Sequence, residues 1–367
     1  MSKSKAAESG LGQEIDTLDT PALLIDLDVV DRNLATMRSL VAGRSVEIRT
    51  HFKSLKCGGL AHYLAERGCE RFMAAKLCEA EVLADAGIRD IVIGNQIIGP
   101  RKIRRLTVLA ERAHVAVCVD SAANVTELSE AACQSRVLLG VLVEVDVGMD
   151  RCGVATPEEA VRLALRVLDN PGLELLGLQG YDGQNQNIHD PAERRRGCQA
   201  ALDRLAQFRH ALEAAGITPR LVSTGGTGTA DLSPSGETVN EIQPGSYVLM
   251  DCNYRKVAPA FGCSLSILTT VISRRSDSHC VLDGGHKAIS KDFGLAVLKD
   301  ESLGRVVSMS EEHTKVEQPA APLRIGSKVE VLPSHCCGTM NLHRRCYAVR
   351  QGRVEAEWPI EASGRYD

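Results

Sequence analysis

Aromatic side chains are scarce in this sequence, at 3% of 367 residues. Apolar residues make up 44%, so the core must pack mainly Leu, Val, Ile and Ala, which is typical of parallel strands covered by helices. No apolar run is long enough to cross a bilayer, and no basic stripe with interleaved aromatics is present. We therefore expect neither a membrane nor nucleic acid among the partners.

A secretion signal and a disulfide framework are also lacking. Residues 1–14 are polar and have no apolar core of the kind that a signal peptide needs. The thirteen cysteines are then expected to be thiols in a reducing compartment, so we predict a cytoplasmic protein. Only Cys336 and Cys337, next to His335, stand in a context that suggests chemistry.

Short apolar runs recur through the first two thirds of the chain. The runs expected to form buried strands are residues 46–53, 72–75, 91–94, 115–120, 137–146, 173–180, 220–223 and 246–250. Apolar residues at helical spacing lie between several of them, for example in 155–168 and 196–216. Buried strands that alternate with helices in this way predict a (β/α)8 barrel.

The pattern changes after about residue 255, where shorter strand-like runs are separated by turns and helical periodicity is weak. We expect an α/β chain in two parts. Residues 28–254 form the barrel, and residues 255–367 form a C-terminal β-domain that the early apolar strand 21–27 completes.

Chemistry in such a barrel sits at the carboxyl ends of the strands. One predicted strand ends at Lys53, which would project into the barrel mouth. Desolvation and nearby cations there lower the pKa of an amine and make it a nucleophile toward an aldehyde. Lys56 is a local competitor, and a solvated loop lysine is the alternative interpretation.

Three further strand ends carry residues suited to an anionic, planar ligand. Arg151 could reach an anion or a phenolate oxygen, or could pair with a neighbouring acid. Tyr181 could contact a planar cofactor, or could pack at the rim. The turn 223–229, STGGTGT, offers close backbone approach, N–H groups and hydroxyls to a phosphate, and residues 245–247 could add to it. Together with Lys53, this set fits a phosphorylated aldehyde cofactor.

The β-domain contains one local feature that suggests a metal. His335 and Cys337 are two residues apart on a segment predicted to be extended, so their side chains are expected to point the same way. Nitrogen and sulfur donors suit Zn²⁺ or a similar ion, and two ligands leave room for substrate and water. A buried histidine beside inert thiols is the alternative.

These motifs, in this order, resemble the fold-type III pyridoxal 5′-phosphate (PLP) enzymes of the D-threonine aldolase, 3-hydroxy-D-aspartate aldolase and D-serine dehydratase group. The resemblance covers nearly the whole chain. It is carried by the segments DTPALLIDLD, RTHFK, EVDVGMDRCGV, GLQGYDG, STGGTGT, EIQPGSYVLMD, LPSHCCGTMNL and EWPI. It implies an alanine-racemase-like barrel with a β-domain, normally a homodimer.

The resemblance also assigns roles to the cofactor residues. Lys53 matches the Schiff-base lysine, and His51 in the same segment is a second catalytic candidate. Arg151 matches an arginine near the phenolic oxygen of PLP, and Tyr181 matches an aromatic residue at the cofactor. The residues matched to the phosphate site are Thr224, Gly225, Gly226 and Thr227, with Gly245, Ser246 and Tyr247 beside them.

His335 and Cys337 match a divalent-metal pair near the β-substituent of the substrate, and the ion would be Zn²⁺ or Mn²⁺. Three positions depart from the aldolases. The pair is His-x-Cys, as in D-serine dehydratases, where the aldolases have His-x-Asp. Thr50 replaces a usual proline, and Gln184 stands where many relatives have histidine. The segments GLQGYDG, GSYVLMD and TMNL are nearer the aldolases, and they cover more of the chain.

The resemblance therefore implies a lyase for small β-hydroxy-D-amino acids, with retro-aldol cleavage to glycine and an aldehyde as the main hypothesis. Dehydratase-type elimination to a keto acid and ammonia uses the same residues and is the alternative, and PLP is the electron sink in both. A non-catalytic PLP homeostasis protein would lack the β-domain and the metal pair. A racemase would need a second acid–base residue, and none is apparent.

Overall fold

The structure is a computed structural model that describes residues 11–233, 238–317 and 323–367. Residues 1–10, most of the polar segment considered above, lie outside the described part. Two compact units follow from the contacts within the chain. The barrel unit consists of Ala35–Tyr247, Lys256–Pro259 and Gly364–Asp367. The β unit consists of the residues up to Leu34, Val248–Arg255 and Ala260–Ser363.

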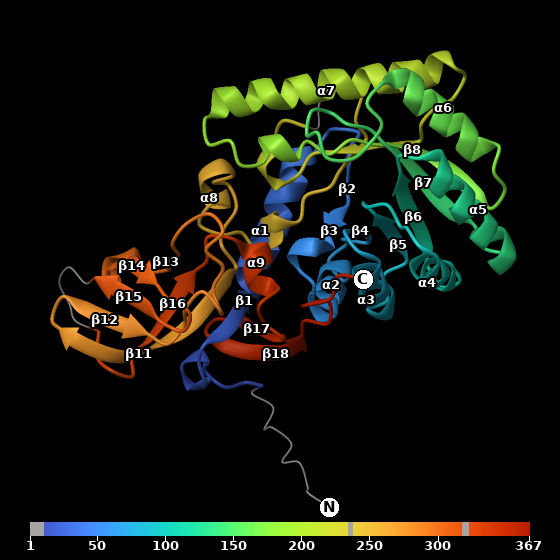
Figure 1. Cartoon of the computed structure of the whole chain (residues 1–367). Coiled ribbons are helices and arrows are strands. Elements are labelled where there is room, and N and C mark those ends of the chain that lie inside the picture. The colour runs from blue at the N-terminus through green and yellow to red at the C-terminus, as the bar shows by residue number, and fades with distance from the viewer. Residues whose placement is uncertain (1–10, 234–237, 318–322) are drawn as a thin grey trace, which may run out of the picture. The chain divides into compact units, whose positions relative to one another are not determined.

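A parallel sheet forms the interior of the barrel unit (Figure 1). Its order is β2-β10-β9-β8-β7-β6-β5-β4-β3. The end strands β2 (Glu47–Ile48) and β3 (Thr50–His51) follow each other in the chain, so the sheet returns on itself and the barrel prediction is confirmed. The remaining strands are β4 (Arg71–Ala74), β5 (Asp90–Ile93), β6 (His114–Val119), β7 (Leu139–Glu144), β8 (Leu173–Gln179), β9 (Leu221–Thr224) and β10 (Glu241–Ile242).

One predicted barrel strand is wrong. Residues 246–250 do not form a strand, and Ser246–Val248 form a 3₁₀ turn, η5. The last strand is instead β10, which pairs with β9 and β2. A short buried apolar run has no periodicity that separates a strand from a turn, and Pro244 ends the ladder here. Its carbonyl still accepts a hydrogen bond from the His51 N–H at 2.9 Å.

Helices cover the outer side of the barrel sheet (Figure 1). They are α2 (Gly58–Ala65), α3 (Leu77–Asp85), α4 (Pro100–Ala110), α5 (Ala122–Ser135), α6 (Pro157–Leu168) and α7 (Pro191–Ala214). In α6, Thr156 and Glu159 form a capping box, which satisfies N–H groups at the helix start. None of the helices within the described ranges has both the length and the apolar character that a membrane span requires.

The β unit is built on a mostly antiparallel sheet of order β14-β15-β12-β11-β1-β17-β18. β1 (Ala22–Asp26) lies inside it, antiparallel to β11 (Leu265–Ser276) and parallel to β17 (Arg345–Arg350). The other elements are β12 (His279–Leu282), β13 (Val297–Leu298), β14 (Arg305–Met309), β15 (Thr314–Glu317), β16 (Lys328–Leu332), α9 (Cys336–Met340) and β18 (Arg353–Pro359). The sequence did not indicate β13, β14 and β15, which are short or partly exposed.

Candidate active site

Three of the predicted cofactor residues meet at the carboxyl ends of the barrel strands. Lys53 lies in a 3₁₀ turn, Phe52–Ser54, directly after β3. Its Nζ is 5.1 Å from the centroid of the Tyr181 ring, which follows β8. The Arg151 guanidinium carbon, from the loop after β7, is 5.6 Å from the same centroid. The tyrosine ring therefore lies beside two cationic groups that arrive from two other strands.

Lys56, the competitor of Lys53, is occupied elsewhere. It is buried, and its Nζ lies 2.9 Å from Oε1 of the buried Glu79. The second carboxylate oxygen of Glu79 accepts a hydrogen bond from the Ala75 N–H at 2.7 Å. This closed arrangement gives Lys56 a structural role, and among the two lysines it leaves Lys53 at the barrel mouth.

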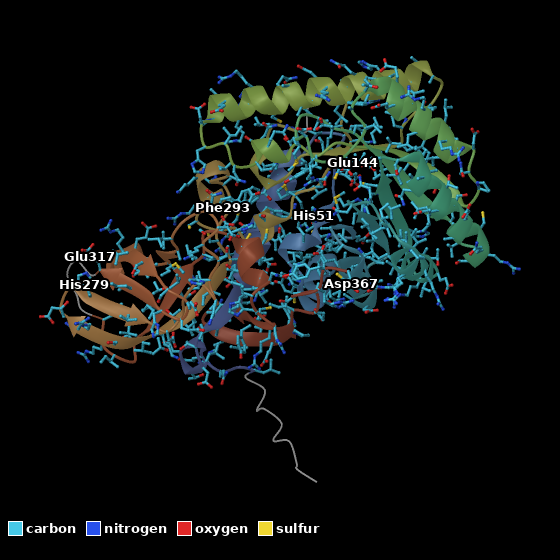
Figure 2. The ribbon with its side chains drawn as sticks, in the orientation of Figure 1. His51, Glu144, His279, Phe293, Glu317 and Asp367 are labelled. Carbon is cyan, nitrogen blue, oxygen red and sulfur yellow. The ribbon has the colours of Figure 1, made fainter. Side chains whose placement is uncertain are left out.

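His51, two residues before Lys53, is almost completely buried (Figure 2). Its Nδ1 accepts a hydrogen bond from the Lys53 backbone N–H at 3.4 Å, and the ring is also hydrogen-bonded to the Met73 backbone. Burial, with the positive charges of Lys53 and Arg151, holds the pKa of His51 well below its ordinary value. The imidazole is therefore neutral, and it fixes the start of the turn that carries Lys53.

The residues predicted for the phosphate are joined by hydrogen bonds. The Thr224 hydroxyl donates to the Gly180 carbonyl at 2.5 Å. The Thr227 hydroxyl oxygen accepts from the Tyr247 N–H at 3.0 Å. The Ser246 hydroxyl lies 3.3 Å from that of Ser54, the residue after Lys53. The structure thus brings the turn after β9 and the η5 turn to the lysine segment.

Tyr247 reaches this group through its backbone. Its ring is fully buried, and its hydroxyl lies 3.0 Å from the Thr50 hydroxyl. Gly245, two residues earlier, stands so close to β3 that a Cβ there would lie 2.5 Å from the His51 carbonyl oxygen. The tyrosine side chain is therefore part of the packing between strands, and the glycine permits the close approach.

Gln186, which sequence reasoning missed, supports the phosphate turn from behind. Its Oε1 accepts a hydrogen bond from the Gly228 N–H at 2.9 Å, and its Nε2 donates to the Thr229 hydroxyl at 2.9 Å. A Cβ on Gly226 would lie 2.5 Å from the same Oε1. The turn is therefore glycine-rich partly because a buried glutamine occupies the space beside it.

Asp182 completes this buried network. Its Oδ1 accepts from Gln186 Nε2 at 2.8 Å, whereas its buried Oδ2 has no hydrogen-bond partner among the described residues. Burial raises the pKa of Asp182 to about 7, although hydrogen bonds from Thr229 and Gln186 act in the opposite direction. A carboxyl group with this environment exchanges its proton near neutral pH.

A second buried carboxylate belongs to Glu144 at the end of β7 (Figure 2), near the Arg151 side chain. Its Oε1 is 3.9 Å from the guanidinium, and its other oxygen accepts a hydrogen bond from Gln96. The same Gln96 amide donates to Asp120 at 2.9 Å. Burial raises the pKa of Glu144 to about 7. The sequence left open whether Arg151 pairs with a neighbouring acid, and Glu144 is that acid. At 3.9 Å, the guanidinium can still contact a ligand.

The metal pair has a different local structure from the one predicted. The segment is not extended, because His335 is the N-cap of helix α9 and Cys337 lies in its first turn. The imidazole and the Cys337 thiol are nevertheless hydrogen-bonded to each other. Cys336 is fully buried, and its Sγ is 4.0 Å from that of Cys337, so it does not simply face away. The two donors converge because of the helix cap.

Asp292 is the other neighbour of His335, with its Oδ2 2.8 Å from Nδ1. Burial by itself would lower the pKa of His335, but the Cys337 and Asp292 contacts raise it to about 9. Within the described residues, no group of three or more metal-ligating side chains is gathered at one point. A histidine and a cysteine are both donors that metal sites use.

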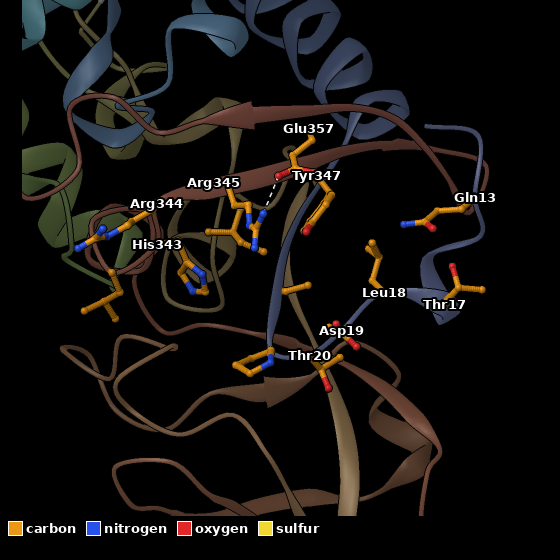
Figure 3. Close-up of a pocket in the computed structure, with 14 residues that line it drawn as sticks. Gln13, Thr17, Leu18, Asp19, Thr20, His343, Arg344, Arg345, Tyr347 and Glu357 are labelled. Atoms are coloured by element: carbon orange, nitrogen blue, oxygen red, sulfur yellow. Dashed lines mark hydrogen bonds and ion pairs between the residues drawn. The ribbon is translucent and has the colours of Figure 1, made fainter. Parts of the chain in front are cut away.

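A pocket of about 560 Å³ lies elsewhere in the β unit (Figure 3). It is lined by the segment that leads into β1 and by the start of β17, including Asp19, Arg344 and Tyr347, and an ion pair joins Arg345 to Glu357 at its wall. The predicted metal pair and the predicted cofactor residues do not contribute to it. This pocket therefore belongs to neither candidate site.

Comparisons with known proteins agree along the whole chain. The family "Alanine racemase, N-terminal domain" matches residues 25–252, and the "Putative serine dehydratase domain" matches 264–349. The chain is 35% identical to 3-hydroxy-D-aspartate aldolase of Paracoccus denitrificans (strain Pd 1222), over 96% of this chain and 94% of that protein. It is also 35% identical to D-threonine aldolase of Arthrobacter sp, over 96% and 95%.

A solved structure extends the agreement to three dimensions. D-threonine aldolase from Filomicrobium marinum matches with a TM-score of 0.92 and 37% identity, over 98% of this chain and 99% of that one. The identity is above 30% over nearly all of both chains, and Lys53, Arg151 and Tyr181 lie at strand ends as the resemblance implies. The similarity therefore shows common descent. The chain belongs to the alanine-racemase-like, fold-type III family of PLP enzymes that includes D-threonine aldolase, 3-hydroxy-D-aspartate aldolase and D-serine dehydratase.

Proposed function

We propose that this protein is a PLP- and divalent-metal-dependent lyase that cleaves small β-hydroxy-D-amino acids to glycine and an aldehyde. The observation that carries the proposal is the meeting of Lys53, Tyr181 and Arg151 at three strand ends, in a chain similar over its whole length to two named aldolases.

The barrel residues fit PLP by their chemistry. Lys53 offers an amine for the aldehyde, Arg151 a cation for the phenolate oxygen, and Tyr181 an aromatic face. Gly225 has φ +73°, and a Cβ there would lie 2.7 Å from the Ser233 hydroxyl, so a larger residue would disrupt the turn proposed for the phosphate. When bound, PLP supplies the electron sink that lets a bond at the substrate Cα break.

The chain's own residues orient the reacting amine. His51 holds the backbone of Lys53 and, being neutral, leaves the lysine without a cationic imidazole beside it. His51 is the second catalytic candidate, and we propose that it positions the backbone of Lys53. Glu144 lies 3.9 Å from one side of the Arg151 guanidinium, and the remaining N–H groups of Arg151 can be directed at an anion.

His335 and Cys337 would hold the metal through one imidazole nitrogen and one thiolate. A soft thiolate donor favours Zn²⁺ over the harder Mn²⁺, and we propose Zn²⁺ first. An ion with open positions can bind and polarise the β-hydroxyl of a substrate.

Dehydratase-type elimination is the second candidate, and one observation favours it. The pair is His-x-Cys, and the chain is also 29% identical, over 88% of its length, to D-threo-3-hydroxyaspartate dehydratase of Delftia sp. (strain HT23). The aldolase hypothesis takes precedence because its two relatives are more similar and cover more of the chain.

Product analysis separates the two hypotheses. D-threonine, D-serine and 3-hydroxy-D-aspartate would be incubated with the PLP-loaded protein, with and without added Zn²⁺ or Mn²⁺, and the L-isomers and Lys53→Ala serve as controls. Glycine with an aldehyde supports the aldolase proposal. A keto acid with ammonia supports elimination, and no turnover with any substrate would contradict both.

We further propose a cytoplasmic homodimer, with domain boundaries at 28–254 and 255–367 plus strand 21–27. All thirteen cysteines lie in the described ranges and none forms a disulfide, which suits a reducing compartment. The family resemblance suggests the dimer, and light scattering of the purified protein tests it.

A further inference from the structure

The connection between β12 and β13, residues 283–296, contains no helix or strand but is tied to the metal-pair segment by several hydrogen bonds. The Ser290 N–H donates to the Thr339 hydroxyl at 3.1 Å, and the Ser334 hydroxyl donates to the Ser290 carbonyl at 3.1 Å. The Phe293 N–H donates to the Ser334 hydroxyl at 3.3 Å. Two hydroxyls that flank His335 and Cys337 in sequence therefore fasten this connection onto the start of α9.

The fastened connection presents two side chains to His335. Asp292 places Oδ2 2.8 Å from Nδ1 of the imidazole. Phe293 meets the same ring edge-on, with the centroids 4.9 Å apart. The imidazole is thus held at one nitrogen by a carboxylate and against one neighbour by an aromatic ring, so that its orientation is set before any ligand arrives.

Gly338 shows that this approach is a requirement of the fold. A Cβ at this position would lie 2.6 Å from the Ser290 hydroxyl and 2.9 Å from Asp292 Oδ2. A larger residue would force the Ser290 and Asp292 side chains to move and would disturb the contact between Asp292 and His335.

We infer that Asp292 is a positioning residue for the metal site: it holds the Nδ1–H tautomer of His335 and directs the Nε2 lone pair, together with Cys337, toward the ion. This inference rests on the proposed metal site. A carboxylate that accepts the second N–H of a metal-binding histidine fixes the tautomer and raises the basicity of the ligating nitrogen. Asp292 acts through His335, because its near oxygen is engaged at Nδ1.

Metal affinity tests the inference without reference to turnover. Zn²⁺ binding to the PLP-loaded protein would be measured by competition with a chromophoric chelator. Asp292→Ala should weaken binding by about 10- to 100-fold, the range found for such outer-shell partners. Asp292→Asn retains an acceptor oxygen for Nδ1–H and should lose less. Glu312→Gln, which removes an exposed carboxylate paired with Lys287, is the matched control and should bind like the parent.

Co²⁺ provides a second readout, because its visible absorption depends on ligand geometry. Asp292→Ala should alter the band shape while the melting temperature and the PLP spectrum stay close to those of the parent. Unchanged affinity and an unchanged band in Asp292→Ala would overturn the inference. If instead His335→Ala binds Zn²⁺ as tightly as the parent, the proposed metal site itself fails, which is a different outcome.

Discussion

The proposed cofactor residues of the barrel unit and the proposed metal pair of the β unit are held in place by different means. Lys53, Arg151 and Tyr181 follow three strands of one closed parallel sheet, and the sheet brings strand ends together whatever their loops contain. His335 and Cys337 lie in one short segment, oriented by a helix cap and by a connection without regular structure. The first arrangement is set by topology, and the second depends on a few side-chain contacts.

This difference has a consequence for mutation. A substitution at one strand end of the barrel removes a chemical group but leaves the other strand ends where they are. A substitution in the connection 283–296 leaves the proposed ligands His335 and Cys337 present but changes their orientation. Mutations at the two places should therefore have different consequences for stability and for ligand geometry.

Lys53→Ala should lower turnover by about 10³-fold or more, because the reacting amine is removed, while the barrel stays folded. Borohydride should attach PLP permanently to a peptide that contains Lys53. Lys56→Met should instead lower stability, because it leaves Glu79 buried without its ion pair. The expected cost is about 3–5 kcal/mol of folding stability. Labelling at Lys56, or an inactive Lys56→Met protein of normal stability, would show that the assignment is wrong.

Removal of the metal should abolish activity while PLP stays bound and the melting temperature changes little. Cys337→Ala and His335→Ala should behave in the same way, because two protein ligands at an open site contribute little to the fold. Cys336→Ala should remain active but lose about 1 kcal/mol of stability, since its buried Sγ is replaced by a small void. Full activity in metal-free protein would leave Cys337 as a half-buried thiol without a role in metal binding.

The sequence predicted which strand ends the candidate cofactor residues follow, for a physical reason, and their role in binding stays a prediction. Their positions depend on strand order, and strand order follows from apolar runs that alternate with helices. The strand predicted at 246–250 is wrong, but the predicted proximity of this segment to the turn 223–229 is not affected. The backbone of Tyr247 reaches Thr227 from a 3₁₀ turn.

The supporting residues were not predictable from local patterns. Asp292 lies 43 residues before His335 in a connection without periodicity, and Gln186 supports a turn 42 residues further along the chain. Asp182 is part of the GYDG motif, but only burial reveals its altered pKa. The convergence of His335 and Cys337 was expected for the wrong reason, since a helix cap, rather than strand alternation, orients them.

Gly226→Ala should weaken PLP binding by about tenfold and also lower stability by about 1–3 kcal/mol, because the new methyl group would press on Gln186. Loss of affinity alone, without loss of stability, is therefore not expected at this position. In a Gln186→Ala background the same substitution should cost less, since the obstructing amide is gone. Strictly additive effects in this double-mutant cycle would contradict the supporting role of Gln186.

The smallest expected effect concerns pH and the buried carboxyl of Asp182. Its pKa is raised from 3.8 in the unfolded chain to about 7 in the fold, chiefly by burial. A raised folded-state pKa means that the native protein holds the proton more tightly, so this contribution to stability is complete below pH 3.8 and is lost as pH rises through about 7.

Asp182→Asn mimics the protonated form and keeps the Oδ1 acceptor for Gln186. Between pH 5 and pH 8, the melting temperature of this variant should fall by a few degrees less than that of the parent. Its PLP affinity at pH 5 should be nearly unchanged. Burial also raises the pKa of Glu144, at the end of the neighbouring strand β7, to about 7, so Glu144→Gln should independently reduce the fall in melting temperature over the same pH interval. A parent protein whose melting temperature does not fall across this interval would show that the two carboxyls are ionised throughout it.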